Sequence, residues 1–165
     1  DAGSWFGSFV GERVPSLRET LDMLRGRAVP IIDVKDAGDR GAVAATVLAK
    51  ALIDDDIEES CIVISSHQKN LRVVSDMCPE TPVAPVATMR SQAEAAVRSP
   101  GYDGLLAWWH ILSPELAEAE RSRGGFVGAW TVPTDKLGLV IGAGANLVVT
   151  NMPMEALKQL RGGDV

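Results

Sequence analysis

Two side chains of opposite charge, Asp33 and Lys35, are the first candidates for chemistry in this sequence. They follow an apolar run over residues 29–32 that is typical of a buried strand. Because side chains alternate along a strand, both point to one face while Val34 points away. Ligands of parallel α/β proteins bind at the carboxyl ends of the strands. The pair therefore indicates a site for a metal ion and a phosphate, and an ion pair that merely closes a strand end is the alternative.

Strand and helix patterns alternate along the chain around this pair. Ser16 and Glu19 have the spacing of a capping box and begin a first helix that ends near Gly26. Five further short apolar runs predict strands over residues 61–65, 82–86, 104–107, 125–130 and 146–150. Helical patterns cover residues 43–52, 71–77, 93–97, 114–123, 136–142 and 153–160. The alternation predicts parallel βα units with right-handed crossovers, although Pro82 and Pro85 are unfavourable in a central strand.

Such units form either a doubly wound sheet or a barrel. A dinucleotide-binding turn needs G-x-G-x-x-G after the first strand, and the sequence has only a lone Gly142-Ala-Gly144 after a helix. Polar or aromatic residues follow most of the strands instead, namely Asp33, Lys35, Ser65, Ser66, Trp108, Trp109, His110, Trp130 and Asn151. Many strand ends meet at one site in a TIM-type (β/α) barrel. We therefore predict an incomplete barrel with six of the eight βα units, as one domain over residues 1–165 with an N-terminal loop over residues 1–16.

Composition limits the classes of partner. The chain has 165 residues, 46% of them hydrophobic, and a formal net charge of -6, which argues against a nucleic-acid-binding protein. No apolar run is long enough to span a membrane, and no signal peptide is visible. The first residue is Asp rather than Met, so we expect the natural start to lie upstream. The compartment cannot be read from the sequence; we expect a soluble protein, by default in the cytoplasm.

Two further groups of residues contain side chains that can bind metals. Cys61 and Cys78 lack zinc-ligand spacing, so free thiols are expected, with a single disulfide as the alternative. The acidic residues between positions 54 and 59 lack the spacing of a calcium-binding loop, and a solvated turn is the preferred interpretation.

Several runs along the whole chain together resemble the glycerophosphodiester phosphodiesterases. They are Asp1-Ala-Gly-Ser-Trp-Phe, Gly11-Glu-Arg-Val-Pro-Ser-Leu, Pro30-Ile-Ile-Asp-Val-Lys, Leu112-Ser-Pro-Glu-Leu, Ala129-Trp-Thr-Val and Gly144-Ala-Asn-Leu-Val-Val-Thr-Asn-Met-Pro. The resemblance implies a TIM-type barrel, a role in glycerol and lipid metabolism, and Mg²⁺ or Ca²⁺ as the cofactor. It also implies metal-dependent hydrolysis of a small-molecule glycerophosphodiester to glycerol 3-phosphate and an alcohol.

The resemblance assigns roles to individual residues. It implies that Asp33 is a carboxylate metal ligand and that Lys35 is catalytic and binds the phosphate oxygens. Trp130 matches an aromatic position that lines the substrate pocket, and Ser65 or Ser66 matches a small polar residue at a strand end. Trp109, with His110, lies on a rim loop that shapes specificity. Asn151 matches a structural turn.

The motifs that carry acid–base chemistry in this family are missing from the sequence. These are a His-Arg-Gly turn, a Glu-x-Asp metal pair and a His-Asp pair, and neither His67 nor His110 has the context of the family's catalytic histidines. The favoured hypothesis is the carboxyl-terminal part of an active enzyme. The alternatives are an inactive relative that serves as a binding or assembly module and self-associates through open sheet edges, or another phosphate-binding barrel enzyme such as an isomerase or aldolase.

Overall fold

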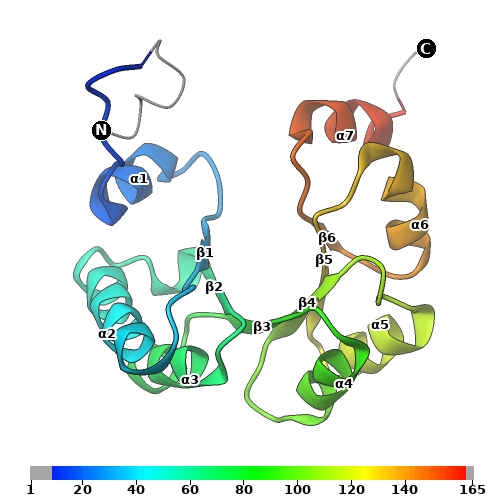
Figure 1. Cartoon of the computed structure of the whole chain (residues 1–165), viewed down its shortest axis with the longest axis horizontal. Coiled ribbons are helices and arrows are strands. Elements are labelled where there is room, and N and C mark those ends of the chain that lie inside the picture. Colours follow the sequence, from blue (N-terminus) through cyan, green and yellow to red (C-terminus); the bar gives the residue numbers. More distant parts are fainter. Residues whose placement is uncertain (1–8, 163–165) are drawn as a thin grey trace. The chain divides into compact units, whose positions relative to one another are not determined.

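The structure is a computed structural model, and it describes residues 9–162. The chain divides at Pro30 into two units, Asp1–Pro30 and Ile31–Val165 (Figure 1). The first unit contains the helix α1 (Leu17–Leu24). The predicted capping box is confirmed, because the Glu19 N–H donates to Ser16 Oγ at 3.3 Å and the Ser16 N–H donates to Glu19 Oε2 at 2.8 Å. The guanidinium of Arg13 and the Ser16 backbone lower the pKa of Glu19 to about 2.

The second unit is a six-stranded parallel sheet with helices between the strands. Its strands are β1 (Ile31–Asp33), β2 (Ile62–Ser65), β3 (Val83–Ala87), β4 (Gly104–Trp108), β5 (Phe126–Trp130) and β6 (Leu147–Val148). Its helices are α2 (Gly38–Asp54), α3 (Gln68–Met77), α4 (Arg90–Arg98), α5 (Pro114–Arg121), α6 (Leu137–Gly142) and α7 (Pro153–Leu160), with short 3-10 turns at Glu58–Ser60 and Thr134–Lys136. Each predicted strand and helix of this unit is present.

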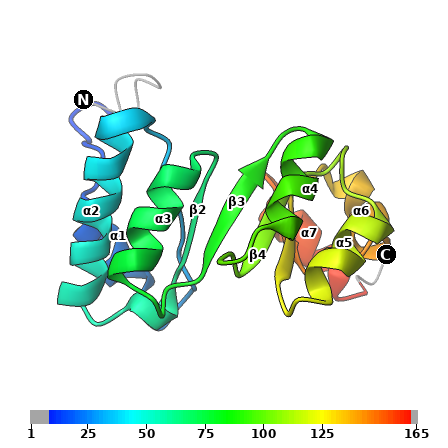
Figure 2. The ribbon, with the colours of Figure 1, turned by 90° about the horizontal axis from the view of Figure 1, so that it is seen from below.

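The order of the strands separates the predicted barrel from the alternative, a doubly wound sheet. The strands pair in the sequence order β1-β2-β3-β4-β5-β6, and all five pairs are parallel. A doubly wound sheet reverses its strand order at a switch point, whereas a barrel keeps it. Figures 1 and 2 show α2 to α6 on the outer side of the sheet. The fold is therefore an incomplete α/β barrel of the TIM type, as predicted.

The two faces of the sheet have separate cores. Leu105 and Ala107 of β4 pack outward into a cluster with helices α4 and α5. Leu106, between them, packs on the inner face with Ile64, Ala84 and partly buried residues from β2, β3, β5 and β6, which are Ile62, Val86, Phe126, Trp130, Leu147 and Val149. The alternation of side chains along a strand therefore tells which rim residues lie on the inner face.

Pro85 is accommodated inside β3 although this strand is central. The residues of β3 that pair with β2 end at Pro85, which lies opposite Ser65, while the pairing with β4 begins at Val86. Proline cannot donate a ladder hydrogen bond. The proline thus lies where the strand exchanges one neighbour for the other, a compensation that the sequence does not reveal.

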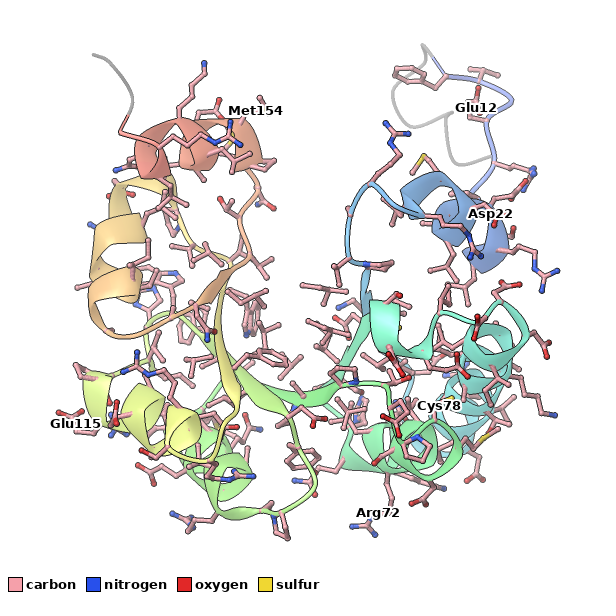
Figure 3. The ribbon with its side chains drawn as sticks, turned by 180° about the vertical axis from the view of Figure 1, so that it is seen from behind. Glu12, Asp22, Arg72, Cys78, Glu115 and Met154 are labelled. Carbon is pink, nitrogen blue, oxygen red and sulfur yellow. The ribbon has the colours of Figure 1, made fainter. Side chains whose placement is uncertain are left out.

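None of the helices within residues 9–162 has the length and apolar character needed to cross a membrane. Cys61 and Cys78 are free, buried thiols, as expected, and Cys78 follows the last residue of α3 (Figure 3).

Candidate functional site

The predicted pair at the end of β1 is formed in the structure. Lys35 Nζ makes an ion pair with Asp33 Oδ2, and the two side chains are 82% and 30% exposed. Asp33 pairs in register with Ile64, which belongs to the inner cluster. Val34 points the other way and is buried. The prediction that Asp33 and Lys35 share a face is confirmed, and that face is the inner one at the carboxyl end of the strand.

The backbone around Lys35 is held by two buried polar side chains. Ser65 Oγ donates to the Val34 carbonyl at 2.6 Å, and the Asn70 amide Nδ2 donates to the carbonyls of Val34 at 3.3 Å and Asp36 at 2.8 Å. Ser65 is fully buried and Asn70 is 1% exposed. The Val34 N–H also donates to the Ile64 carbonyl at 3.0 Å. These bonds hold the peptide group before Lys35 and the one after Asp36, which bracket the lysine.

Ser65 has little capacity left for a ligand. Besides donating to Val34, its hydroxyl accepts from the His67 N–H at 3.0 Å and from Asn70 Nδ2 at 3.3 Å. A hydroxyl has one donor and two acceptor positions, so all three are in use. Its substrate-binding role stays a prediction. Ser66, the alternative, is exposed, and the alternation from Ile64 puts it on the inner side.

Two tryptophans end adjacent strands on the inner face. Trp130 packs with the inner cluster, and Trp108 pairs in register with it and is 40% exposed. Trp109, one of the residues predicted to bind substrate, packs on the outer face against a cluster that contains Leu137 and Val140 of α6. Counting in steps of two from an inward leucine would have identified Trp108 as the inner residue.

His110 stacks beside the two neighbouring indoles. Its ring centroid lies 4.4 Å from that of Trp108 and 3.6 Å from that of Trp109. It is exposed in the turn after β4, three strands away from β1 in the sheet. His67, the other histidine, precedes the first residue of α3 and contributes its backbone N–H to Ser65.

The described residues do not make a complete metal site. Residues 9–162 contain no group of three or more His, Cys, Asp or Glu side chains that could hold an ion. Mg²⁺ and Ca²⁺ need six or more oxygen ligands, and Mg²⁺ sites use one or two carboxylates with water and phosphate. Asp33 offers one carboxylate, which is already paired with Lys35. The acidic residues between positions 54 and 59 also do not form such a group of metal-binding side chains.

Comparison with known proteins identifies structural neighbours. No protein-family model matches the sequence, and no curated protein matches it. Among solved structures, a glycerophosphodiester phosphodiesterase from Parabacteroides distasonis superposes with a TM-score of 0.79 at 19% identity, over 92% of this chain and 66% of that one. A glycerophosphodiester phosphodiesterase from Agrobacterium tumefaciens superposes with a TM-score of 0.76 at 18% identity, over 94% of this chain and 67% of that one. A putative glycerophosphoryl diester phosphodiesterase from Silicibacter pomeroyi superposes with a TM-score of 0.75 at 18% identity, over 91% of this chain and 57% of that one.

These comparisons bear on the fold. The chain spans about two thirds or less of the length of each of these proteins. The resemblance to glycerophosphodiester phosphodiesterases is confirmed at the level of the fold, because the same TIM-type arrangement covers nearly the whole of this chain.

Proposed function

We propose that this chain forms part of a glycerophosphodiester phosphodiesterase, which hydrolyses its substrate to glycerol 3-phosphate and an alcohol. The observation that carries the proposal is the pair of Asp33 and Lys35 on the inner face at the carboxyl end of β1. In TIM-type barrels this is the end where active sites lie. The solved structures of the same fold that bear this name support the choice of reaction.

Lys35 is the proposed catalytic residue of this chain. In the reaction a water oxygen bonds to phosphorus, the bond from phosphorus to the alcohol oxygen breaks, and the alcohol takes up a proton. Negative charge grows on the phosphoryl oxygens as the water attacks. An ammonium group is a compact charge that stabilises those oxygens, and the 82% exposure of Lys35 leaves it accessible to them.

Asp33 is the proposed metal ligand, but it does not suffice alone. A divalent cation, Mg²⁺ or Ca²⁺, would supply further charge at the phosphoryl oxygens when bound. The described residues lack the other ligands. We therefore assign Asp33 one further task that the structure supports directly, which is to hold the ammonium of Lys35 in the absence of substrate.

Trp108 and Trp130 are proposed to face the part of the substrate beyond the phosphate. They lie at the ends of β4 and β5, whereas Lys35 follows β1, so the rim is charged at one side and aromatic at the other. Trp109 and Ser65 are also predicted to bind substrate, and both face the outer layer of the fold. A cytoplasmic location stays a prediction.

The test is hydrolysis of glycerophosphocholine by the natural protein that contains this chain. We expect Lys35→Ala to lower kcat/KM by about 100-fold or more, as the loss of one charge-stabilising group usually does. The matched control is Lys50→Ala, because Lys50 is an exposed lysine in the carboxyl-terminal half of α2, and its rate should equal that of the wild type. Equal rates for both variants would contradict the proposal.

The second candidate is an inactive relative that serves as a binding or assembly module. It is favoured by the edges of the sheet, since β1 and β6 each pair on one side only among the described residues. Open parallel edges invite association with another chain. Binding of sn-glycerol 3-phosphate without hydrolysis of any glycerophosphodiester, together with a dimer in light scattering, would select this candidate over the first.

A further inference from the structure

We infer that Asn70 is a positioning residue for Lys35, with Ser65 as its partner, and that the two set the affinity of this rim for a phosphate group. The inference rests on the proposed function of Lys35. Asn70 lies in the first turn of α3, 36 residues after Val34 in the sequence. It acts through the backbone and does not touch the substrate.

The contacts of Asn70 surround the lysine on both sides. Its Nδ2 donates to the carbonyl of the residue before Lys35, at 3.3 Å, and to that of the residue after it, at 2.8 Å. The two carbonyls belong to the Val34–Lys35 and Asp36–Ala37 peptide groups, so one buried amide holds the backbone at both ends of the Lys35–Asp36 pair. The lysine side chain therefore starts from a restrained stretch of backbone even though its own end is exposed.

The segment between β1 and α2 is held by a small set of contacts. Residues 35–40 are exposed, and they lie between β1, which ends at Asp33, and the body of α2. These contacts include the Asn70 amide, the bond from the Gly41 N–H to the Ala37 carbonyl at 3.2 Å and the ion pair of Lys69 with Asp39. The Asn70 amide is the side-chain contact nearest to Lys35 on its carboxyl side. Loss of the amide should let the base of Lys35 move.

The buried amide itself is a costly way to fill the space. Asn70 Oδ1 is buried and has no hydrogen-bond partner within the described residues. An unpartnered buried acceptor destabilises a fold, and leucine, which branches at the same carbon but is larger, would carry no such acceptor. The two neighbours in the same face of α3, Leu71 and Val74, are apolar, while Arg72 points away to solvent (Figure 3). What the asparagine adds over leucine is its donors to the loop.

The experiment measures the affinity of the whole chain for sn-glycerol 3-phosphate by calorimetry, with Asn70→Leu as the main variant. We expect Asn70→Leu to weaken binding about fivefold or more, within the usual range of coupling between contacting groups. In a Lys35→Ala background the same change should have no further effect, because the group that it positions is gone. Val74→Ala is the matched control on the same helix, and it should lower the melting temperature while leaving the affinity unchanged.

Ser65→Ala provides an independent variant if Asn70→Leu does not fold. It removes the hydroxyl that donates to Val34 and should weaken binding in the same direction. The positioning role is refuted if Asn70→Leu and Ser65→Ala bind like the wild type, or if they lose equal affinity with and without Lys35. The proposed function fails separately, if the wild type does not bind sn-glycerol 3-phosphate or if Lys35→Ala binds it equally well.

Discussion

Gly41 offers a sharp test of how closely α2 approaches the loop that carries Lys35. This glycine is buried in the first turn of the helix. A Cβ added to it would lie 2.2 Å from the carbonyl oxygen of Asp36 and 2.6 Å from Asn70 Oδ1. Real Cβ atoms do not come so near to a backbone oxygen, so Gly41→Ala must push the helix and the loop apart.

The size of the effect follows from two opposing terms. Forcing an extra methyl group into a packed site costs about 1–3 kcal/mol, and the contact with backbone places this case toward the upper end. Replacing glycine by alanine inside a helix stabilises the helix by about 1 kcal/mol. We therefore expect Gly41→Ala to lower the free energy of unfolding by about 1–2 kcal/mol. In a chain of this size, that lowers the melting temperature by about 2–8 °C.

The assay is thermal unfolding followed by circular dichroism, with Gly138→Ala as the matched control. Gly138 also lies in the first turns of a helix, α6, but an added Cβ there meets nothing within 4 Å. In the control, the free energy of unfolding should rise by about 1 kcal/mol and the melting temperature by about 2–4 °C relative to the wild type. A Gly41→Ala protein that melts as high as the control would refute the close contact between α2 and the Asp36 carbonyl.

Three further predictions concern the rim and the core. Trp108→Leu should lower the affinity for a glycerophosphodiester, measured by calorimetry, with little change in the free energy of unfolding. Trp109→Leu should keep the affinity and lower the free energy of unfolding by about 1–3 kcal/mol, because only Trp109 packs in the cluster with Leu137 and Val140; the reverse pattern would exchange their roles. Burial raises the pKa of Glu120, so the folded protein binds this proton more tightly than the unfolded chain does. The free energy of unfolding should therefore fall as the pH rises above about 4.5 through the folded pKa. In Glu120→Gln, chemical unfolding should show a smaller fall over this range, and parallel pH profiles of the two proteins would exclude a contribution of Glu120. Burial raises the pKa of Cys61 to about 11 and also raises that of Cys78. Iodoacetamide at pH 8 should therefore label neither thiol of the folded protein, and mass spectrometry should detect labelling only after urea is added. Rapid labelling of the folded chain would contradict their burial.

The elements of the fold could be predicted because their signals are local. The capping box of Ser16 and Glu19 begins α1, and each strand was marked by its own apolar run. The order of the strands is not local, and the barrel was predicted indirectly, from the residues that follow the strands and from the missing G-x-G-x-x-G turn. The structure confirms it by placing each strand beside its successor. Pro85 weakened the prediction of β3, since its compensation depends on which neighbour each residue pairs with.

The candidate site likewise combines contacts that a local pattern predicts with contacts that depend on the fold. Asp33 and Lys35 are two residues apart, so the period of a strand predicts that they meet. Asn70 meets the same loop only because β1 and β2 pair in a particular register and α3 then returns along the sheet. No pattern within a short window could show that contact. The inward position of Trp108 follows from a local pattern, because Leu105, Leu106 and Ala107 alternate between the outer and inner cores just before it.

The rim of this sheet is therefore built in two different ways. At the end of β1 a charged side chain stands on a backbone that buried hydrogen bonds hold in place, which suits a group whose charge and position are constant, such as the phosphate. At the ends of β4 and β5 two indoles offer broad apolar faces that tolerate groups of different shape. In a phosphodiesterase the phosphate is common to all substrates and the alcohol varies. If the proposed function holds, the end of β1 would face the phosphate, which is constant, and the ends of β4 and β5 would face the alcohol, which varies.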